Sequence, residues 1–184
     1  MAANPIYPAV LEAGKRGDTL FLDLGCQSMS AKALQYCDSY SSRCPAVGTD
    51  LRKLVFDGYP GSNVIGCDLR PEYVDLGYEL FGDRDRCPIR FITGNIFDVS
   101  DNPAPTDVAE AGPRSLTSVN DLAQLRGALT HVYTGALFHL FDEETQYKLA
   151  VRLALLVKRS PGTVIFGRHQ GLKVEGMIED NLGR

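Results

Sequence analysis

The sequence lacks the features that mark membrane and secreted proteins. No apolar run reaches the roughly 20 residues that a helix needs to cross a bilayer. The run LAVRLALLV (149–157) is short and contains Arg152. The first eighteen residues have no basic start followed by an apolar stretch, so we expect no secretory signal.

Cysteine pairs and an excess of positive charge are also missing. The five cysteines are odd in number and contain no C-x-x-C pair, which argues against a disulfide framework and a structural zinc site. The formal net charge of −4 gives no basic surface for nucleic acid or an anionic membrane. We therefore expect a reduced, cytoplasmic protein that holds no metal and binds neither nucleic acid nor a membrane.

What is present is an ordinary globular composition with alternating strand and helix patterns. Of the 184 residues, 44% are hydrophobic and 23% are charged, which fits one soluble domain over residues 1–184. Apolar strand patterns lie within residues 19–24, 63–69, 88–99, 128–141 and 161–171. Helix patterns lie at residues 50–58, 70–81, 115–127 and 142–159.

This alternation predicts an α/β fold: a three-layer, Rossmann-like, mostly parallel sheet with helices on both faces. Only thirteen residues follow Gly171, too few for another helix and strand. The expected sheet therefore lacks a C-terminal strand pair.

A polar residue stands at or just after the end of three of the predicted strands, each with a neighbour that could also contact a ligand. The pairs are Asp23 and Gly25, Asp68 and Leu69, and Asn95 and Ile96. In a doubly wound sheet these strand ends meet at one edge, where the ligand binds. A carboxylate such as Asp68 accepts hydrogen bonds from both ribose hydroxyls. Asn95 followed by an apolar residue suits an adenine, with an amide for the ring edge and a side chain for its face.

The glycine turn after the first strand is interrupted. An acid that binds ribose normally lies about 20 residues after such a turn. Asp68 lies 43 positions after Gly25 but 20 after Gly48. Removing residues 28–46 would join FLDLGCQ directly to VGTDLRKLVFDG, so we interpret residues 27–47 as a loop insertion in the cofactor turn.

Over residues 5–171 the chain resembles class I S-adenosylmethionine-dependent methyltransferases. It is most similar to the fungal natural-product methyltransferases that carry LDLGC…G…DLRKLVFDG. The most specific part is RKLVFDG…N…G.DL.PE..DLGY.LF.DRD over residues 52–85. The segment TGALFHLFD (134–142) matches the family's segment after the fourth strand, which faces the sulfonium and the acceptor.

The resemblance implies S-adenosyl-L-methionine as the cofactor and a set of residues that bind it. Asp23 and Gly25 would support the methionine end, and Gly48 would close the loop. The remaining cofactor residues would be Asp68 and Leu69 at the ribose, Asn95 and Ile96 at the adenine, and Thr134 near the sulfonium.

Some of these side chains have purely structural alternatives. Asp68 could cap the following helix, and Asn95 could stabilise a turn. His139 is the candidate catalytic residue, as a base or an acceptor contact, but it could equally be packed in the core. Arg168 and His169 at the end of the last strand could reach an acidic acceptor.

The function expected from the resemblance is methyl transfer to a carboxylate or hydroxyl oxygen of a small natural product in secondary metabolism. One alternative is an inactive remnant that binds the cofactor, or a truncated gene product. A more distant one is an NAD-type reductase. The helix that follows the turn begins Thr49-Asp50, and an acid there disfavours a pyrophosphate. The third glycine of the dinucleotide fingerprint is also missing.

Overall fold

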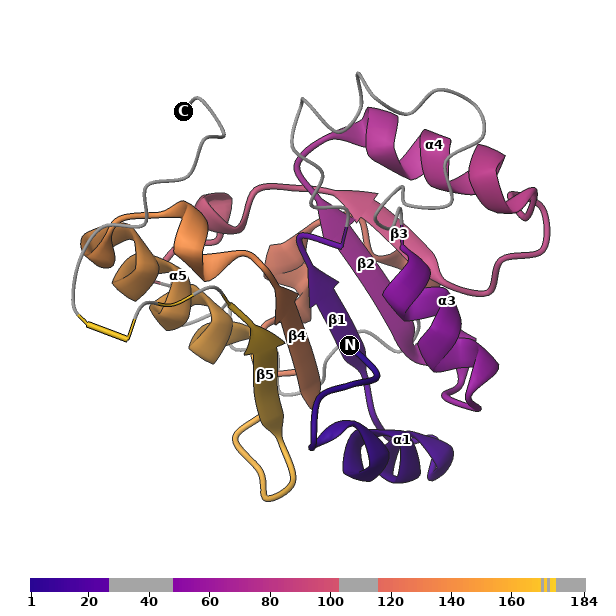
Figure 1. Cartoon of the computed structure of the whole chain (residues 1–184), viewed down its shortest axis with the longest axis horizontal. Helices are drawn as coiled ribbons and strands as arrows, with labels where there is room; N and C mark the ends of the chain where they lie inside the picture. Colours follow the sequence, from indigo (N-terminus) through magenta and orange to yellow (C-terminus); the bar gives the residue numbers. More distant parts are fainter. Residues whose placement is uncertain (27–47, 103–115, 170, 172, 175–184) are drawn as a thin grey trace.

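The computed structural model describes residues 1–26, 48–102, 116–169, 171 and 173–174. Its centre is a five-stranded sheet in the order β3-β2-β1-β4-β5, with all neighbouring strands parallel (Figure 1). The strands are β1 (Phe21–Leu24), β2 (Val64–Asp68), β3 (Arg90–Thr93), β4 (His131–Gly135) and β5 (Val164–Arg168). Each lies inside a range predicted from the sequence, and the predicted α/β fold is confirmed.

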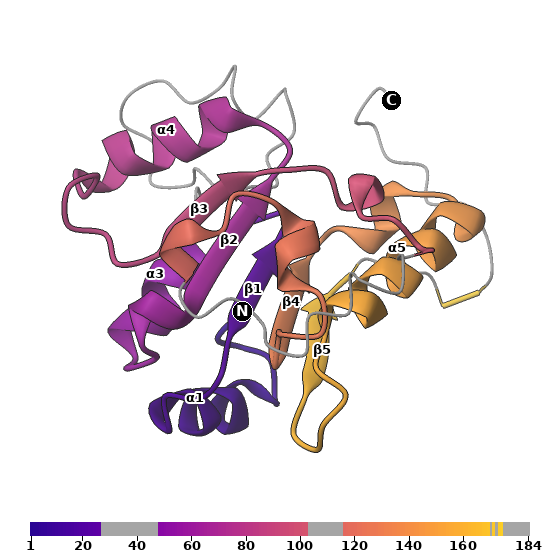
Figure 2. The ribbon, with the colours of Figure 1, turned by 180° about the vertical axis from the view of Figure 1, so that it is seen from behind.

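Helices cover both faces of the sheet (Figures 1 and 2). In the described ranges the α-helices are α1 (Tyr7–Lys15), α3 (Thr49–Phe56), α4 (Pro71–Phe81) and α5 (Glu143–Leu156). Strand side chains alternate between the two faces: Phe21 packs with α1 and α3, whereas Leu22 packs with α5. No helix in the described part of the chain is long and apolar enough to cross a membrane.

Local sequence signals explain where α4 and α5 begin. Asp142 caps α5 because its side chain accepts a hydrogen bond from the Thr145 backbone N–H at 2.8 Å. Two glutamates follow in the first turn, where the helix dipole favours negative charge. Pro71 starts α4, and Gly82 ends it in the left-handed conformation.

The helix predicted over residues 115–127 is wrong. The structure has two short 3₁₀ turns there, η4 (Leu116–Ser118) and η5 (Leu122–Leu125). The buried apolar residues are Leu116, Val119, Leu122 and Leu125, which recur at every third position. That spacing matches the three residues per turn of a 3₁₀ helix rather than the 3.6 of an α-helix.

The N-terminal helix α1 was missed by the sequence reading. Tyr7, Val10 and Gly14 face the sheet from this helix. Gly14 lies directly on the Tyr59 ring, since a Cβ at this position would come within 2.2 Å of Tyr59 Cδ2. The spacing i, i+3, i+7 was the signal available in the sequence.

Candidate functional site

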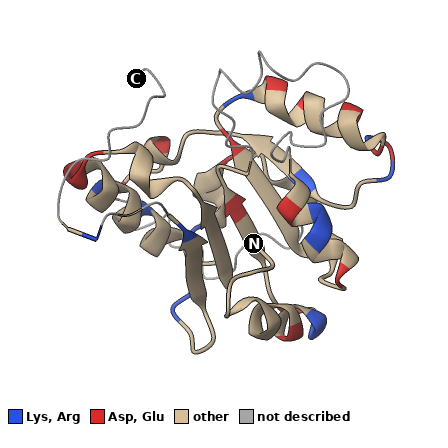
Figure 3. Cartoon of the chain, in the orientation of Figure 1, with Lys and Arg blue, Asp and Glu red and all other residues tan. Residues whose placement is uncertain are grey.

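The carboxyl ends of all five strands point to one edge of the sheet, because every pair is parallel. Strand order reverses beside β1: the chain continues to β2 and β3 on one side and to β4 and β5 on the other. In such sheets the ligand crevice lies outside the strand ends at this reversal. Figure 3 shows acidic positions at the ends of β1 and β2, next to this point.

Asp23 is a buried carboxyl at this edge. Its side chain is only 2% exposed, and its Oδ1 has no hydrogen-bond partner among the described residues. Burial raises the pKa of Asp23 well above its ordinary value, and the negative charges of Asp50 and Asp68 add to this. Buried carboxyl oxygens are normally paired, so this arrangement is suited to a cationic ligand group.

The turn after β1 is closed by residues that lie far apart in the sequence. The Gly25 N–H donates to the Cys67 carbonyl at 2.9 Å, which ties the turn to β2. The Gly48 N–H donates to the Cys26 carbonyl at 3.3 Å. Gly25 and Gly48 both have a positive φ, 75° and 71°, which glycine adopts without strain.

The Cys26–Gly48 hydrogen bond bears on the predicted insertion. Residues 27–47 lie outside the described residues, but the residues on either side of them are directly bonded. Cys26, after β1, and Gly48, before α3, are therefore neighbours in space. The insertion itself stays a prediction.

Asp68 ends β2 and is 8% exposed. Its Oδ1 accepts from the Arg70 N–H at 3.2 Å, and its main-chain carbonyl accepts from the Gly94 N–H at 2.9 Å. The N-cap of α4 is Arg70, so Asp68 braces the turn before the helix rather than capping it. Leu69 beside it is 65% exposed and offers an apolar surface at the strand end.

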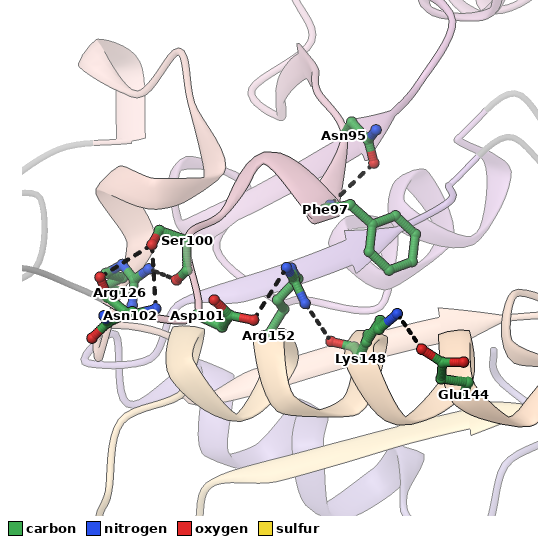
Figure 4. A network of polar contacts seen from close by, with 9 residues as sticks. All are labelled: Asn95, Phe97, Ser100, Asp101, Asn102, Arg126, Glu144, Lys148 and Arg152. Carbon is green, nitrogen blue, oxygen red and sulfur yellow. Dashed lines mark hydrogen bonds and ion pairs between the residues drawn. The ribbon is translucent and has the colours of Figure 1, made fainter.

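Asn95 starts the segment that follows β3. Its Oδ1 accepts from the Phe97 N–H at 3.1 Å, which begins the 3₁₀ turn η2 (Ile96–Asp98) (Figure 4). Asn95 therefore stabilises a turn through its side-chain oxygen. Its side-chain NH₂ group is the part that could donate a hydrogen bond to a ligand. Ile96 is 6% exposed and packed in the core on the α5 face of the sheet.

This segment is held from the other side by α5. The Arg152 guanidinium lies 5.6 Å from the centre of the Phe97 ring, and its Nη2 lies 3.6 Å from an Asp101 carboxylate oxygen (Figure 4). The Arg152 side chain is 13% exposed. A mostly buried arginine of α5 thus contacts the segment that follows Asn95.

The end of β4 lies at the same edge of the sheet, on the other side of β1 from β2 and β3. Thr134 is 1% exposed and lies in the strand itself. Ala136 follows with φ 59°, a left-handed conformation that costs a non-glycine residue energy and is concentrated at functional sites. Leu137 lies next to Gly25: a Cβ on that glycine would be 3.4 Å from Leu137 Cδ1. The resemblance includes both residues in the segment 134–142, but the sequence did not single out either of them.

His139 lies in the 3₁₀ turn η6 (Phe138–Leu140), directly after β4. Its Nδ1 is buried and has no partner among the described residues. The His169 ring lies 6.5 Å from the His139 ring and 5.2 Å from the Phe138 ring, centre to centre. Burial, followed by the charge of His139, lowers the pKa of His169. The structure therefore brings together two histidines from the ends of β4 and β5.

The predicted site residues thus share one edge but differ in exposure. Asp23, Asp68, Ile96 and Thr134 are buried, whereas Leu69 is exposed. No group of three or more His, Cys, Asp or Glu side chains is arranged to hold a metal ion within the described ranges.

Comparison with known proteins gives relatives of one kind. No family model matches the chain. Methyltransferase adrK of Penicillium rubens is 35% identical over 168 residues, which are 91% of this chain and 47% of adrK. Asnovolin E/Chermesin D methyltransferase nvfJ of Aspergillus novofumigatus is 31% identical over 183 residues, 100% of this chain and 52% of nvfJ. O-methyltransferase atr3 of Stereocaulon alpinum is 32% identical over 91% of this chain and 38% of atr3.

The chain spans about half the length of the curated relatives that it matches. Among solved structures, PKMT2 from Rickettsia typhi in complex with AdoHcy is similar, with a TM-score of 0.51 and 17% identity. That match covers 89% of this chain and 24% of PKMT2, and it shows the shared fold. By sequence, over about nine-tenths of its length or more, the chain is a homologue of fungal secondary-metabolite methyltransferases.

Proposed function

We propose that the chain binds S-adenosylmethionine at the ends of β1 to β4 as part of a methyltransferase. The observation that carries this proposal is Asp23, a buried carboxyl whose Oδ1 has no partner in the described structure and which lies where the strand order reverses. A cofactor with an ammonium and a sulfonium would neutralise that carboxylate. A pyrophosphate at the same place would lie beside the carboxyls of Asp23 and Asp68, whereas the Asp50 carboxylate is paired with the N-terminal ammonium of Met1 at 2.9 Å.

The other residues at this edge fit the remaining parts of the cofactor. Gly25 and Gly48 carry no side chains of their own that would hold a ligand away from the backbone of the turn. Asp68 supplies carboxylate oxygens for the ribose hydroxyls. Asn95 supplies an NH₂ donor for the acceptor nitrogens of an adenine edge, and the exposed Leu69 supplies an apolar contact for its face.

When bound, the cofactor supplies a methyl group that is already activated by the sulfonium. The chain's own part is to position that end of the cofactor and to exclude water from it. Leu137 and Phe138 after β4 supply apolar surface there, both half-buried against the core. The Nδ1 of His139, which has no partner among the described residues, would take a proton from a hydroxyl acceptor, whereas a carboxylate acceptor needs no base.

The proposed acceptor is a small natural product methylated on a carboxylate or hydroxyl oxygen, in a cytoplasmic secondary-metabolite pathway. The support is the names of the relatives, which include an O-methyltransferase and an asnovolin E/chermesin D methyltransferase. Every relative named above is a methyltransferase, and none is a nicotinamide-dependent reductase.

Isothermal titration of the chain with S-adenosylhomocysteine, and separately with NAD⁺, tests the proposal. We expect S-adenosylhomocysteine to bind and NAD⁺ not to bind. Asp23→Asn and Asp68→Asn should weaken binding, whereas Lys148→Gln, which removes an exposed ion pair on α5, should not. Binding of NAD⁺ alone, or equal affinity in all variants, would contradict the proposed site.

A further inference from the structure

The most specific sequence pattern, residues 52–85, is only partly explained by the cofactor site. Its first residue, Arg52, lies in the first turn of α3 and pairs with Asp83, which follows α4. The pair is bidentate: Nε lies 2.7 Å from Oδ2 and Nη2 lies 2.9 Å from Oδ1. The two side chains are 13% and 16% exposed. Such a planar fork cannot be reproduced by a lysine.

Aromatic rings surround the same guanidinium. Its Cζ lies 4.3 Å from the centre of the Phe81 ring, 5.3 Å from that of Phe91 and 5.9 Å from that of Tyr78. Phe81 and Tyr78 belong to α4, and Phe91 belongs to β3. Cation–π contacts therefore add to the ion pair and fix the side chain in one position. Arg52 joins the start of α3 to α4 and β3.

The Arg52 guanidinium also contacts the cofactor turn. Its Nη1 lies 3.5 Å from the Gly48 carbonyl oxygen. A Cβ on Gly48 would lie 2.8 Å from that Nη1 and 2.9 Å from Phe91 Cζ. Gly48 is thus packed against the guanidinium and the ring, with its N–H directed to the Cys26 carbonyl. The Gly48 carbonyl also accepts from the Arg52 backbone N–H at 3.1 Å, so Arg52 contacts the residue that closes the turn through both its main chain and its side chain.

We infer that Arg52 and Asp83 are positioning residues for the cofactor turn. They touch no cofactor atom themselves; they hold Gly48, and through it the path from β1 into α3, in the shape that receives the ligand. This inference rests on the proposed function, because the turn is a binding element only if the cofactor binds there. The alternative is an ion pair that stabilises the fold without affecting the turn.

The test compares Arg52→Gln, Arg52→Lys and Asp83→Asn with a matched control, Arg84→Gln. Arg84 also pairs with an aspartate, Asp75 at 2.7 Å, and lies over the Tyr78 ring at 4.7 Å, but it is 54% exposed. Two quantities are measured: the Kd for S-adenosylhomocysteine, and the hydrogen-exchange rate of the Gly48 amide by NMR. The Gly25 amide, which bonds to the Cys67 carbonyl, serves as the internal reference.

We expect the Kd to rise on the order of tenfold or more in Arg52→Gln and Asp83→Asn, because small displacements of a binding element are costly. The Gly48 amide should exchange faster in these variants while the Gly25 amide keeps its rate. Arg52→Lys should keep the charge and the fold but recover neither quantity fully, and Arg84→Gln should match the wild type.

Two results would overturn the positioning role of Arg52. Folded Arg52 variants with wild-type affinity and an unchanged Gly48 exchange rate would overturn the inference. Equal acceleration at Gly48 and Gly25 would also overturn it, because that indicates global destabilisation. If Arg52→Gln does not fold, Arg52→Lys decides. If the wild type does not bind S-adenosylhomocysteine, the proposed function fails, and the Gly48 exchange alone decides whether Arg52 positions the turn.

Discussion

Replacing Asp23 with asparagine should stabilise the protein and weaken cofactor binding at the same time. The pKa of Asp23 in the folded state lies well above the ordinary value of 3.8, chiefly because of burial. The folded state therefore holds the proton more tightly than the unfolded state does. The stability that this gives is present at low pH and is lost as the pH rises through the folded pKa. At neutral pH the ligand-free protein carries that cost.

The expected change in the free energy of unfolding follows from the Oδ1 of Asp23, which has no hydrogen-bond partner among the described residues. A buried polar group without a partner costs about 1–3 kcal/mol, and a neutral amide of the same shape reduces the part that comes from charge. We expect Asp23→Asn to gain about 1–2 kcal/mol at pH 7.5. For a domain of this size, that raises the unfolding midpoint by roughly 2–4 °C for each kcal/mol. Binding should weaken because the variant has no negative charge for the cationic ligand.

The assay is thermal unfolding at pH 7.5 together with titration of S-adenosylhomocysteine. Asp83→Asn is the contrasting control, since its hydrogen bonds from Arg52 lower the pKa of Asp83 and the same substitution should destabilise the fold. If Asp23→Asn lowers the midpoint and binds as the wild type does, the carboxylate is a structural group and the reasoning is refuted.

Three further predictions concern other parts of the chain. Deleting residues 28–46, which lie between the hydrogen-bonded Cys26 and Gly48, should leave the fold intact and S-adenosylhomocysteine binding equal or tighter by calorimetry. A loss of folding would contradict the insertion. Burial lowers the pKa of His131 to about 4, so stability should fall by roughly 2–3 kcal/mol between pH 6.5 and 4, and denaturant curves should show a smaller fall in His131→Asn. Gly14→Ala should cost about 1–3 kcal/mol in urea unfolding, because its Cβ would meet Tyr59; an unchanged midpoint would refute this.

Periodicity in the sequence was sufficient for the sheet and most of its helices. Buried strands such as Phe21–Leu24 are largely apolar runs, and α5 has an acidic start and an apolar face. The segment 115–127 failed because an apolar repeat of three is close to that of an α-helix. The difference between 3.0 and 3.6 residues per turn becomes clear only when the buried positions are known.

Only the part of the site that is formed by polar residues at the strand ends could be predicted from the sequence. Topology alone brings Asp23 and Asp68 to one edge, so their proximity followed from the predicted order of elements. Contacts from the loops could not be predicted in this way. The left-handed Ala136 and the approach of Leu137 to Gly25 depend on tertiary packing, which no local pattern encodes.

A crystal structure of the chain soaked with S-adenosylhomocysteine tests the central claim most directly. We expect density at the ends of β1 and β2, with the amino group of the ligand near Asp23 and its ribose hydroxyls on Asp68. Density at another place, or an edge that stays empty at saturating ligand while the crystals contain folded protein, would contradict the account.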